Sequence, residues 1–219
     1  MPGFVYFDGQ VDLVWTASPA PPNAGLPPPS DGAPYTWTGE AIGVAAPDRR
    51  IVVVTPHISA TNISSVSVAG VACTKVVAGS GTFTFADIWV TSTPITSGTT
   101  ANITVSGYAT FPRIACVLYA LYGAGNPLSP TAYSDTSATY DAAITVPAGG
   151  AALGVFASQV TGSASWTNMS SDISANFNAG GGAQYTYSSA RSTTAGSYTV
   201  TATPSAAAAS ALGVAVWST

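Results

Sequence analysis

Residues 64–77 read Ser-Ser-Val-Ser-Val-Ala-Gly-Val-Ala-Cys-Thr-Lys-Val-Val, and this stretch decides the fold class of the chain. Valine recurs on both sides of Ala69-Gly70, and β-branched residues favour extended backbone. Glycine supplies the positive φ that a tight reversal between two strands requires. The stretch therefore predicts a β-hairpin over residues 64–68 and 71–77.

Short apolar runs bounded by Gly, Pro, Asn and Asp continue along the rest of the chain, as at Val146-Pro147-Ala148-Gly149-Gly150. No stretch repeats apolar residues at helical spacing between capping residues. An all-β fold is expected, an antiparallel sandwich or barrel. Its predicted strands are 35–44, 50–59, 64–68, 71–77, 82–91, 101–106, 113–121, 142–146, 151–157, 184–189, 197–203 and 211–217.

Residues 1–34 differ in composition from the rest of the chain. The stretch 19–29 is rich in proline, which favours extended polyproline II and cannot complete a strand ladder. We therefore expect an extended N-terminal arm over residues 1–34 and one β-sandwich domain over residues 35–219. The arm is expected to anchor the protein to a partner subunit through its apolar side chains, chiefly Phe4, Tyr6, Phe7 and Trp15.

Two segments of the β region share a rhythm. Residues 94–105 read P-x-x-S-G before an I-x-V strand, and residues 147–155 read P-A-G-G before an alternating strand. Two turns of similar type would look the same in any sandwich. The rhythm leaves a duplication open, but a single domain is the stronger interpretation.

Charge is scarce, at 6% of residues against about 25% in ordinary globular domains. The net charge is −4 and no Lys/Arg cluster could follow a phosphate backbone, which argues against nucleic acid as a partner. No apolar run approaches membrane-spanning length. The N-terminus lacks a basic segment before an apolar run, so we expect synthesis in the cytoplasm without a signal peptide.

The chemistry that most enzymes need is also scarce: one His, one Glu and one Lys. His57 could serve as a general base, but no G-x-S-x-G elbow accompanies it, which favours a structural strand-end histidine. Glu40 could pair with an Asp as in a glycosidase, yet a polar position on an alternating strand usually faces water. Asp48-Arg49-Arg50 could bind an anion, but a structural turn is favoured. We expect no catalytic residues.

The two cysteines, Cys73 and Cys116, lie 43 positions apart, which excludes a C-x-x-C motif and a cysteine-rich zinc site. Both lie in apolar β-type runs, so buried free thiols are favoured over a mutual disulfide. We expect neither a metal nor a cofactor.

Aromatic and amide side chains gather between residues 162 and 187, on what the sequence predicts to be a long loop. Aromatic rings can stack on sugars while amides bind their hydroxyls. The alternative is that the rings are core and the Asn residues shape turns. The candidate glycan-binding residues are Trp166, Asn176, Tyr185 and Arg191.

A further pattern runs through residues 41–53, 63–72, 86–90 and 97–105, in segments such as Ala46-Pro47-Asp48-Arg49-Arg50-Ile51 and Ser97-Gly98-Thr99-Thr100-Ala101. It resembles small virion proteins of tailed phages, prophages and gene transfer agents of proteobacteria, used in head decoration, spikes, fibres or tail accessories. The resemblance covers about residues 40–122. It implies a β-sandwich with jelly-roll character and a location on a virus-like particle.

These observations together predict a non-enzymatic structural protein on the particle surface. Its partners would be other virion proteins, reached through residues 1–34, and a homo-oligomer is expected. The alternative is a carbohydrate-binding module that recognises a host surface glycan. A glycan-cleaving enzyme is the third and weakest hypothesis, because the chain has few carboxylates and one His.

Overall fold

The computed structural model describes residues 10–18, 34–59, 61–107, 113–128, 131–135, 139–178 and 184–219. Over these residues the chain forms seventeen strands, paired in antiparallel sheets, and no helix. The predicted all-β fold is confirmed. Within the described ranges there is accordingly no helix long and apolar enough to span a membrane.

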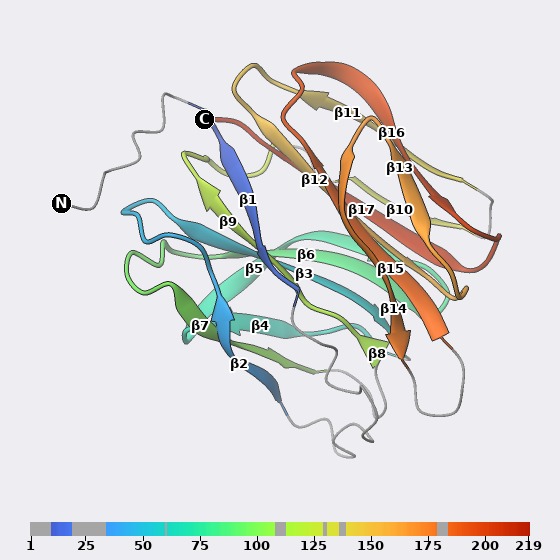
Figure 1. Cartoon of the computed structure of the whole chain (residues 1–219), viewed down its shortest axis with the longest axis horizontal. Coiled ribbons are helices and arrows are strands. Elements are labelled where there is room, and N and C mark those ends of the chain that lie inside the picture. The colour runs from blue at the N-terminus through green and yellow to red at the C-terminus, as the bar shows by residue number, and fades with distance from the viewer. Residues whose placement is uncertain are drawn as a thin grey trace.

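Strands from the first part of the chain form one nine-stranded sheet, in blue to green in Figure 1. Its order is β1-β9-β3-β6-β5-β4-β7-β2, and β8 also pairs with β3. The strands are β1 (Asp12–Ala17), β2 (Tyr35–Ala41), β3 (Arg50–Ile58), β4 (Ser65–Val68), β5 (Val71–Ser80), β6 (Thr84–Thr91), β7 (Thr100–Ser106), β8 (Arg113–Ile114) and β9 (Val117–Tyr122).

This sheet curls into a nearly closed, barrel-like sandwich. One apolar core contains side chains from both ends of the sheet, such as Val66 and Ile103 on one side and Val53 and Leu118 on the other. The long strand β5 makes the turn, because its first residues pair with β4 and the rest pair with β6 through a bulge between Lys75 and Val77. We call this unit the N-terminal sandwich.

Strands from the second part of the chain form a five-stranded sheet, β10-β17-β12-β15-β14, and a three-stranded sheet, β11-β16-β13. A core that includes Tyr140, Phe156 and Leu212 lies between them. We call this unit the C-terminal sandwich. Its strands are β10 (Thr131–Asp135), β11 (Tyr140–Val146), β12 (Ala151–Ser158), β13 (Ala164–Thr167), β14 (Ser170–Asn178), β15 (Gln184–Ser192), β16 (Gly196–Pro204) and β17 (Ser210–Trp217).

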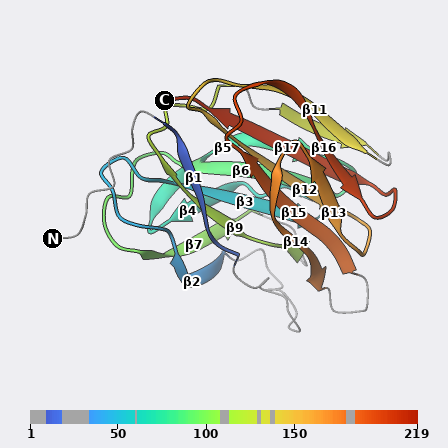
Figure 2. The same cartoon turned by 45° about the horizontal axis from the view of Figure 1, so that its top comes forward.

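The two sandwiches pack against each other through a shared core between the nine-stranded and five-stranded sheets. Val52 and Val54 of β3 enter it together with Val155 of β12, while Ile51 and Val53 point into the N-terminal core instead. Burial on both faces explains why residues 51–54 of β3 are all apolar. The three-stranded sheet lies on the side away from the nine-stranded sheet (Figure 2).

The backbones of the two sandwiches approach closely at two glycines. A Cβ on Gly79 of β5 would lie 2.8 Å from the carbonyl oxygen of Leu212. A Cβ on Gly213 of β17 would lie 2.5 Å from the carbonyl oxygen of Ala86. Only glycine allows the two sheets to meet this closely.

Both sandwiches repeat one strand-pairing scheme. We count β1 to β7 and β9 as strands one to eight of the first set, and β10 to β17 as strands one to eight of the second. In each set, strand eight pairs with one and three, six pairs with three and five, and seven pairs with two and four. Only the first set adds a ladder between strands four and five.

The rhythm noted in the sequence does not correspond to this repeat. Residues 94–105 lead into β7, the seventh strand of the first set, whereas residues 147–155 lead into β12, the third strand of the second. The repeated feature is the pairing scheme and not the turn motif.

All twelve predicted strands overlap observed ones, and four observed strands were not predicted: β1, β10, β13 and β14. The predicted long loop over residues 162–187 is wrong for most of its length, since β13, β14 and the start of β15 occupy it. Their Ser, Thr and Asn residues hide the strand signal, because these residue types are also typical of turns and loops.

The expected N-terminal arm also needs correction where the structure describes it. β1 pairs with β9 in the nine-stranded sheet, with Asp12 opposite Tyr122. Val11 and Leu13 are buried in the shared core. Alternating apolar residues at 11 and 13 satisfy the period of a strand, so this stretch adds a strand before the proline-rich stretch begins.

Candidate functional site

The four predicted glycan-binding residues do not form one surface. Trp166 lies on β13 of the three-stranded sheet and Asn176 on β14 of the five-stranded sheet, on the sides where these two sheets face each other. Trp166 is half-buried, its Nε1 donates to Ser188 Oγ at 3.1 Å, and its ring covers Gly154. The Asn176 Oδ1 accepts from the Gly162 amide and from Thr186 Oγ1, both at 3.1 Å. Both side chains therefore hold the sandwich together.

Tyr185 and Arg191 lie on the opposite face of the five-stranded sheet. Tyr185 packs against the shared core. Arg191 Nε donates to Asp172 Oδ1 at 2.9 Å, and its Nη1 donates to the carbonyl oxygen of Leu13 at 2.6 Å. Asp172 Oδ2 also accepts from the Tyr119 hydroxyl at 3.0 Å. This group ties β1 and β9 to the C-terminal sandwich.

Of the predicted anchoring residues, Phe4, Tyr6 and Phe7 lie outside the described residues. Trp15 lies on β1 and is 41% exposed. β1 is the terminal strand of its sheet, so Trp15 is accessible at a sheet edge.

The chain's one Lys and one His lie inside the N-terminal sandwich, where Lys75 pairs with Asp87 and His57 packs on Phe85 of the same strand as Asp87. Lys75 Nζ lies 2.7 Å from Asp87 Oδ2, donates to the Ile63 carbonyl oxygen, and sits 4.5 Å from the centre of the Trp89 ring. His57 stacks on Phe85 with ring centres 4.6 Å apart. The side chains of His57 and Asp87 are fully buried.

Burial sets the protonation of this group. It lowers the pKa of His57 from 6.5 to about 3, against the opposing effect of its bond to the Thr55 carbonyl. The His57 Nδ1 lies 2.8 Å from the Thr55 carbonyl oxygen. A carbonyl oxygen can only accept, so Nδ1 carries the proton of the neutral ring. Burial raises the pKa of Asp87 from 3.8 to about 6, although Lys75 opposes the rise.

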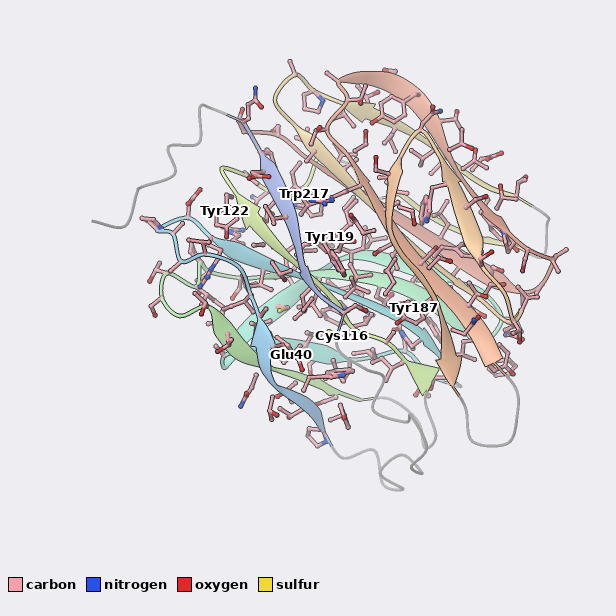
Figure 3. The ribbon with its side chains drawn as sticks, in the orientation of Figure 1. Glu40, Cys116, Tyr119, Tyr122, Tyr187 and Trp217 are labelled. Atoms are coloured by element: carbon pink, nitrogen blue, oxygen red, sulfur yellow. The ribbon has the colours of Figure 1, made fainter. Side chains whose placement is uncertain are left out.

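A general acid or base must touch the reacting group. His57 and Asp87 are fully buried, so a substrate could not reach either side chain. His57 Nε2 and Asp87 Oδ1 are both buried. Glu40 lies on β2, apart from Tyr119, Tyr187 and Trp217 of the shared core (Figure 3). Among the described residues no three His, Cys, Asp or Glu side chains are placed to hold a metal ion.

The Asp48-Arg49-Arg50 turn is also internal. Arg49 is fully buried and donates to three carbonyl oxygens, those of Gly43 at 2.6 Å, Ser97 at 2.8 Å and Ile95 at 3.0 Å. Asp48 Oδ2 accepts from the Gly123 amide at 2.6 Å. Arg49 thus joins the loop before β3 to the loop before β7, a structural role that the sequence favoured over anion binding.

The two cysteines are free thiols. Cys116 is buried and Cys73 is half-buried, and burial raises the pKa of Cys73 to about 12. A thiol with so high a pKa is a poor nucleophile at neutral pH.

An open depression lies at one end of the C-terminal sandwich, with a volume of about 420 Å³. The β13–β14 turn, the ends of β14 and β15, the β15–β16 loop and β16 form its walls. The lining residues are Asn168, Met169, Ser170, Ser192, Thr194 and Tyr198.

No protein family model, no curated protein and no solved structure matches this chain. The resemblance to virion proteins therefore stays a prediction.

Sequence reasoning did not single out the depression's lining residues, although Asn168 to Ser170 fall within the stretch of residues 162–187 where a site was expected. Tyr198 lies in the predicted strand 197–203, and no feature of the sequence distinguishes it as a binding residue. Asn168 has a positive φ of 62° in the β13–β14 turn, a conformation that Asn tolerates better than most residues. The tendency of Asn to form turns was the one sequence signal that could have located this turn.

Proposed function

We propose that this chain is a non-enzymatic structural subunit on the surface of a tailed phage or phage-like particle, of the decoration, spike or fibre type. The observation that carries the proposal is the repeated strand order. In a jelly roll, strands one, eight, three and six form one sheet, and strands two, seven, four and five form the other. Viral capsid domains commonly use this fold, and so do lectins.

Both strand sets support a jelly-roll assignment. The first contains the run β1-β9-β3-β6 and the run β5-β4-β7-β2. The second contains β10-β17-β12-β15 and β11-β16-β13, with β14 beside β15. On this proposal the chain is two jelly rolls in tandem, packed through their larger sheets.

Fold alone does not imply function, so the use of charge matters. Arg49, the Lys75–Asp87 pair and the Arg191–Asp172 pair all bind groups of this chain, in buried or half-buried positions. Charged side chains that bind other groups of the same chain are not available for acid–base chemistry on a substrate. This supports a structural role over a hydrolytic one.

The proposed attachment is through the N-terminal segment. Trp15 offers an exposed ring on an edge strand, and edge strands readily pair with other chains. Anchoring by Phe4, Tyr6 and Phe7, and assembly into a homo-oligomer, are further parts of this proposal.

Quantitative mass spectrometry of purified particles tests the proposal. The protein should be present in a fixed copy number, and Trp15→Ser should reduce that number while the folded protein remains soluble. Leu128→Ser is the matched control, because Leu128 is 53% exposed elsewhere on the surface. Absence of the wild-type protein from particles would refute the particle location. Normal incorporation of Trp15→Ser would refute only the anchor. Polysaccharide cleavage abolished by Glu40→Gln would restore the enzyme hypothesis.

Carbohydrate binding is the second candidate function, and it can coexist with the first. The open depression at the end of the C-terminal sandwich favours it, since its lining combines an aromatic ring with hydroxyl and amide groups.

A further inference from the structure

We infer that the depression formed by Asn168, Ser170, Ser192, Thr194 and Tyr198 binds a neutral sugar. The inference rests on the second candidate function and names its site and ligand class. It moves the site away from Trp166, Asn176, Tyr185 and Arg191, whose polar groups are engaged or whose rings are packed inside the protein.

The aromatic wall of the depression is held in place before any ligand arrives. Tyr198 is half-buried and packs against the core of the C-terminal sandwich. Its hydroxyl is hydrogen-bonded to Ser192 Oγ at 3.0 Å and to the Thr194 carbonyl oxygen at 3.1 Å. A ring that is already fixed loses little conformational entropy when a ligand binds, and this favours binding of a small ligand.

The polar wall offers free hydrogen-bonding groups. Asn168 Nδ2 donates to the Thr199 carbonyl oxygen at 2.7 Å, which fixes the amide, and within the described residues its Oδ1 accepts no hydrogen bond. Ser170 is exposed, and within the described part of the chain its hydroxyl forms no hydrogen bond. Asn168 and Ser170 line the same depression as Tyr198, and an amide oxygen and a hydroxyl match the donors and acceptors of a sugar.

The charge of the depression selects against ionic ligands. None of its lining residues is charged. Arg191 neighbours Ser192 in sequence and lies opposite Ser170 in the β14–β15 ladder, but its guanidinium is engaged by Asp172 and by the carbonyl oxygen of Leu13. An acidic sugar or a phosphate would therefore lose part of its hydration here without gaining a counter-charge, which is unfavourable. The volume of about 420 Å³ lies within the range of small-molecule sites.

Binding of the full chain to an array of neutral and acidic oligosaccharides, followed by titration of the bound ones, tests the inference. Neutral oligosaccharides should bind and acidic ones should not. Asn168→Gly keeps the positive φ while removing the amide, and Ser170→Ala removes the hydroxyl. Each should weaken binding about five-fold, the loss of one hydrogen bond. Ser165→Ala is the matched control, an exposed serine on β13 outside the depression, and should bind as wild type.

Each other outcome contradicts a specific part of the inference. Binding that both variants leave unchanged would overturn the site and keep the carbohydrate function. Preference for acidic oligosaccharides would overturn the ligand class. Failure to bind any oligosaccharide would overturn the site together with the carbohydrate function, and would leave the particle location unaffected.

Discussion

The two sandwiches share one pairing scheme and differ in what they bury. Among the described residues, the fully or nearly fully buried polar side chains of the N-terminal sandwich include Arg49, His57 and Asp87. Those of the C-terminal sandwich are Ser158, Thr186, Ser188, Ser189 and Ser210, together with Asp172, whose side chain is 7% exposed and pairs with Arg191 beside the shared core. The same topology therefore forms with or without a charge in the core between its own two sheets. Strand patterning specifies the fold, and the buried charges stabilise particular loops and strand ends.

The largest effect is expected where a buried charge joins two loops. Arg49→Leu should lower the free energy of unfolding by about 3–5 kcal/mol, because three carbonyl oxygens lose their donors inside the protein. Arg50→Ala, next in sequence and half-buried, should change it by less than about 0.5 kcal/mol. Urea denaturation measures both. Equal effects would show that the guanidinium bonds of Arg49 contribute nothing.

The next largest effect concerns β1, which belongs to the shared core. Leu13→Ala should cost about 2–4 kcal/mol, because Leu13 is 2% exposed between the sandwiches. Val14→Ala on the same strand should cost less than about 1 kcal/mol, since Val14 is 36% exposed. Thermal unfolding followed by circular dichroism separates them. A neutral Leu13→Ala would restore the view that the N-terminal segment is an arm independent of the β domain.

A smaller loss is expected where the sandwiches touch. Gly213→Ala places a methyl group 2.5 Å from the Ala86 carbonyl oxygen, and the backbone must shift by separating the sheets. Overpacking of this kind costs about 1–3 kcal/mol. Gly125→Ala is the control, because its nearest neighbour would be 3.7 Å away and its φ is ordinary. Indistinguishable stabilities of the two variants would contradict the close approach of the sheets.

The smallest effect is a pH dependence in which two buried groups oppose each other. Folded His57 binds its proton only near pH 3 but unfolded His57 near 6.5, so stability falls as the pH drops below 6.5. Asp87 keeps its proton up to about pH 6 when folded and loses it near 3.8 when unfolded. The contribution of Asp87 to stability is therefore full below pH 3.8 and is lost as the pH rises through 6.

From pH 7 to pH 5 the wild type should lose less than about 1 kcal/mol, because the His57 loss of about 2 kcal/mol is mostly offset by Asp87. Asp87→Asn removes the offset and should show the full loss. Chemical denaturation at the two pH values measures the difference. A variant with the same pH dependence as the wild type would contradict the opposing titrations.

Sequence reasoning located the strands with local signals and missed what depends on distant contacts. The Ala69-Gly70 turn was predicted, and both residues have positive φ, 51° and 79°. The corresponding turn at Asn168-Met169 was missed because it lacks glycine. The predicted glycan residues do not share one surface, because Trp166 lies on β13 and alternation along β14 and β15 sends side chains to opposite faces, which a loop assignment could not reveal. The depression combines residues from three strands, and no local pattern joins them.

The central claim is that two repeats of one topology form a single folding unit through their shared core. Differential scanning calorimetry of the intact chain tests this most directly, through the ratio of the calorimetric to the van't Hoff enthalpy. A single transition with a ratio close to one is predicted, since neither sandwich can expose Val52, Ile88, Val155 and Trp217 to water and remain folded. Two resolved transitions, or a ratio near two, would show that the sandwiches unfold independently and would contradict the claim.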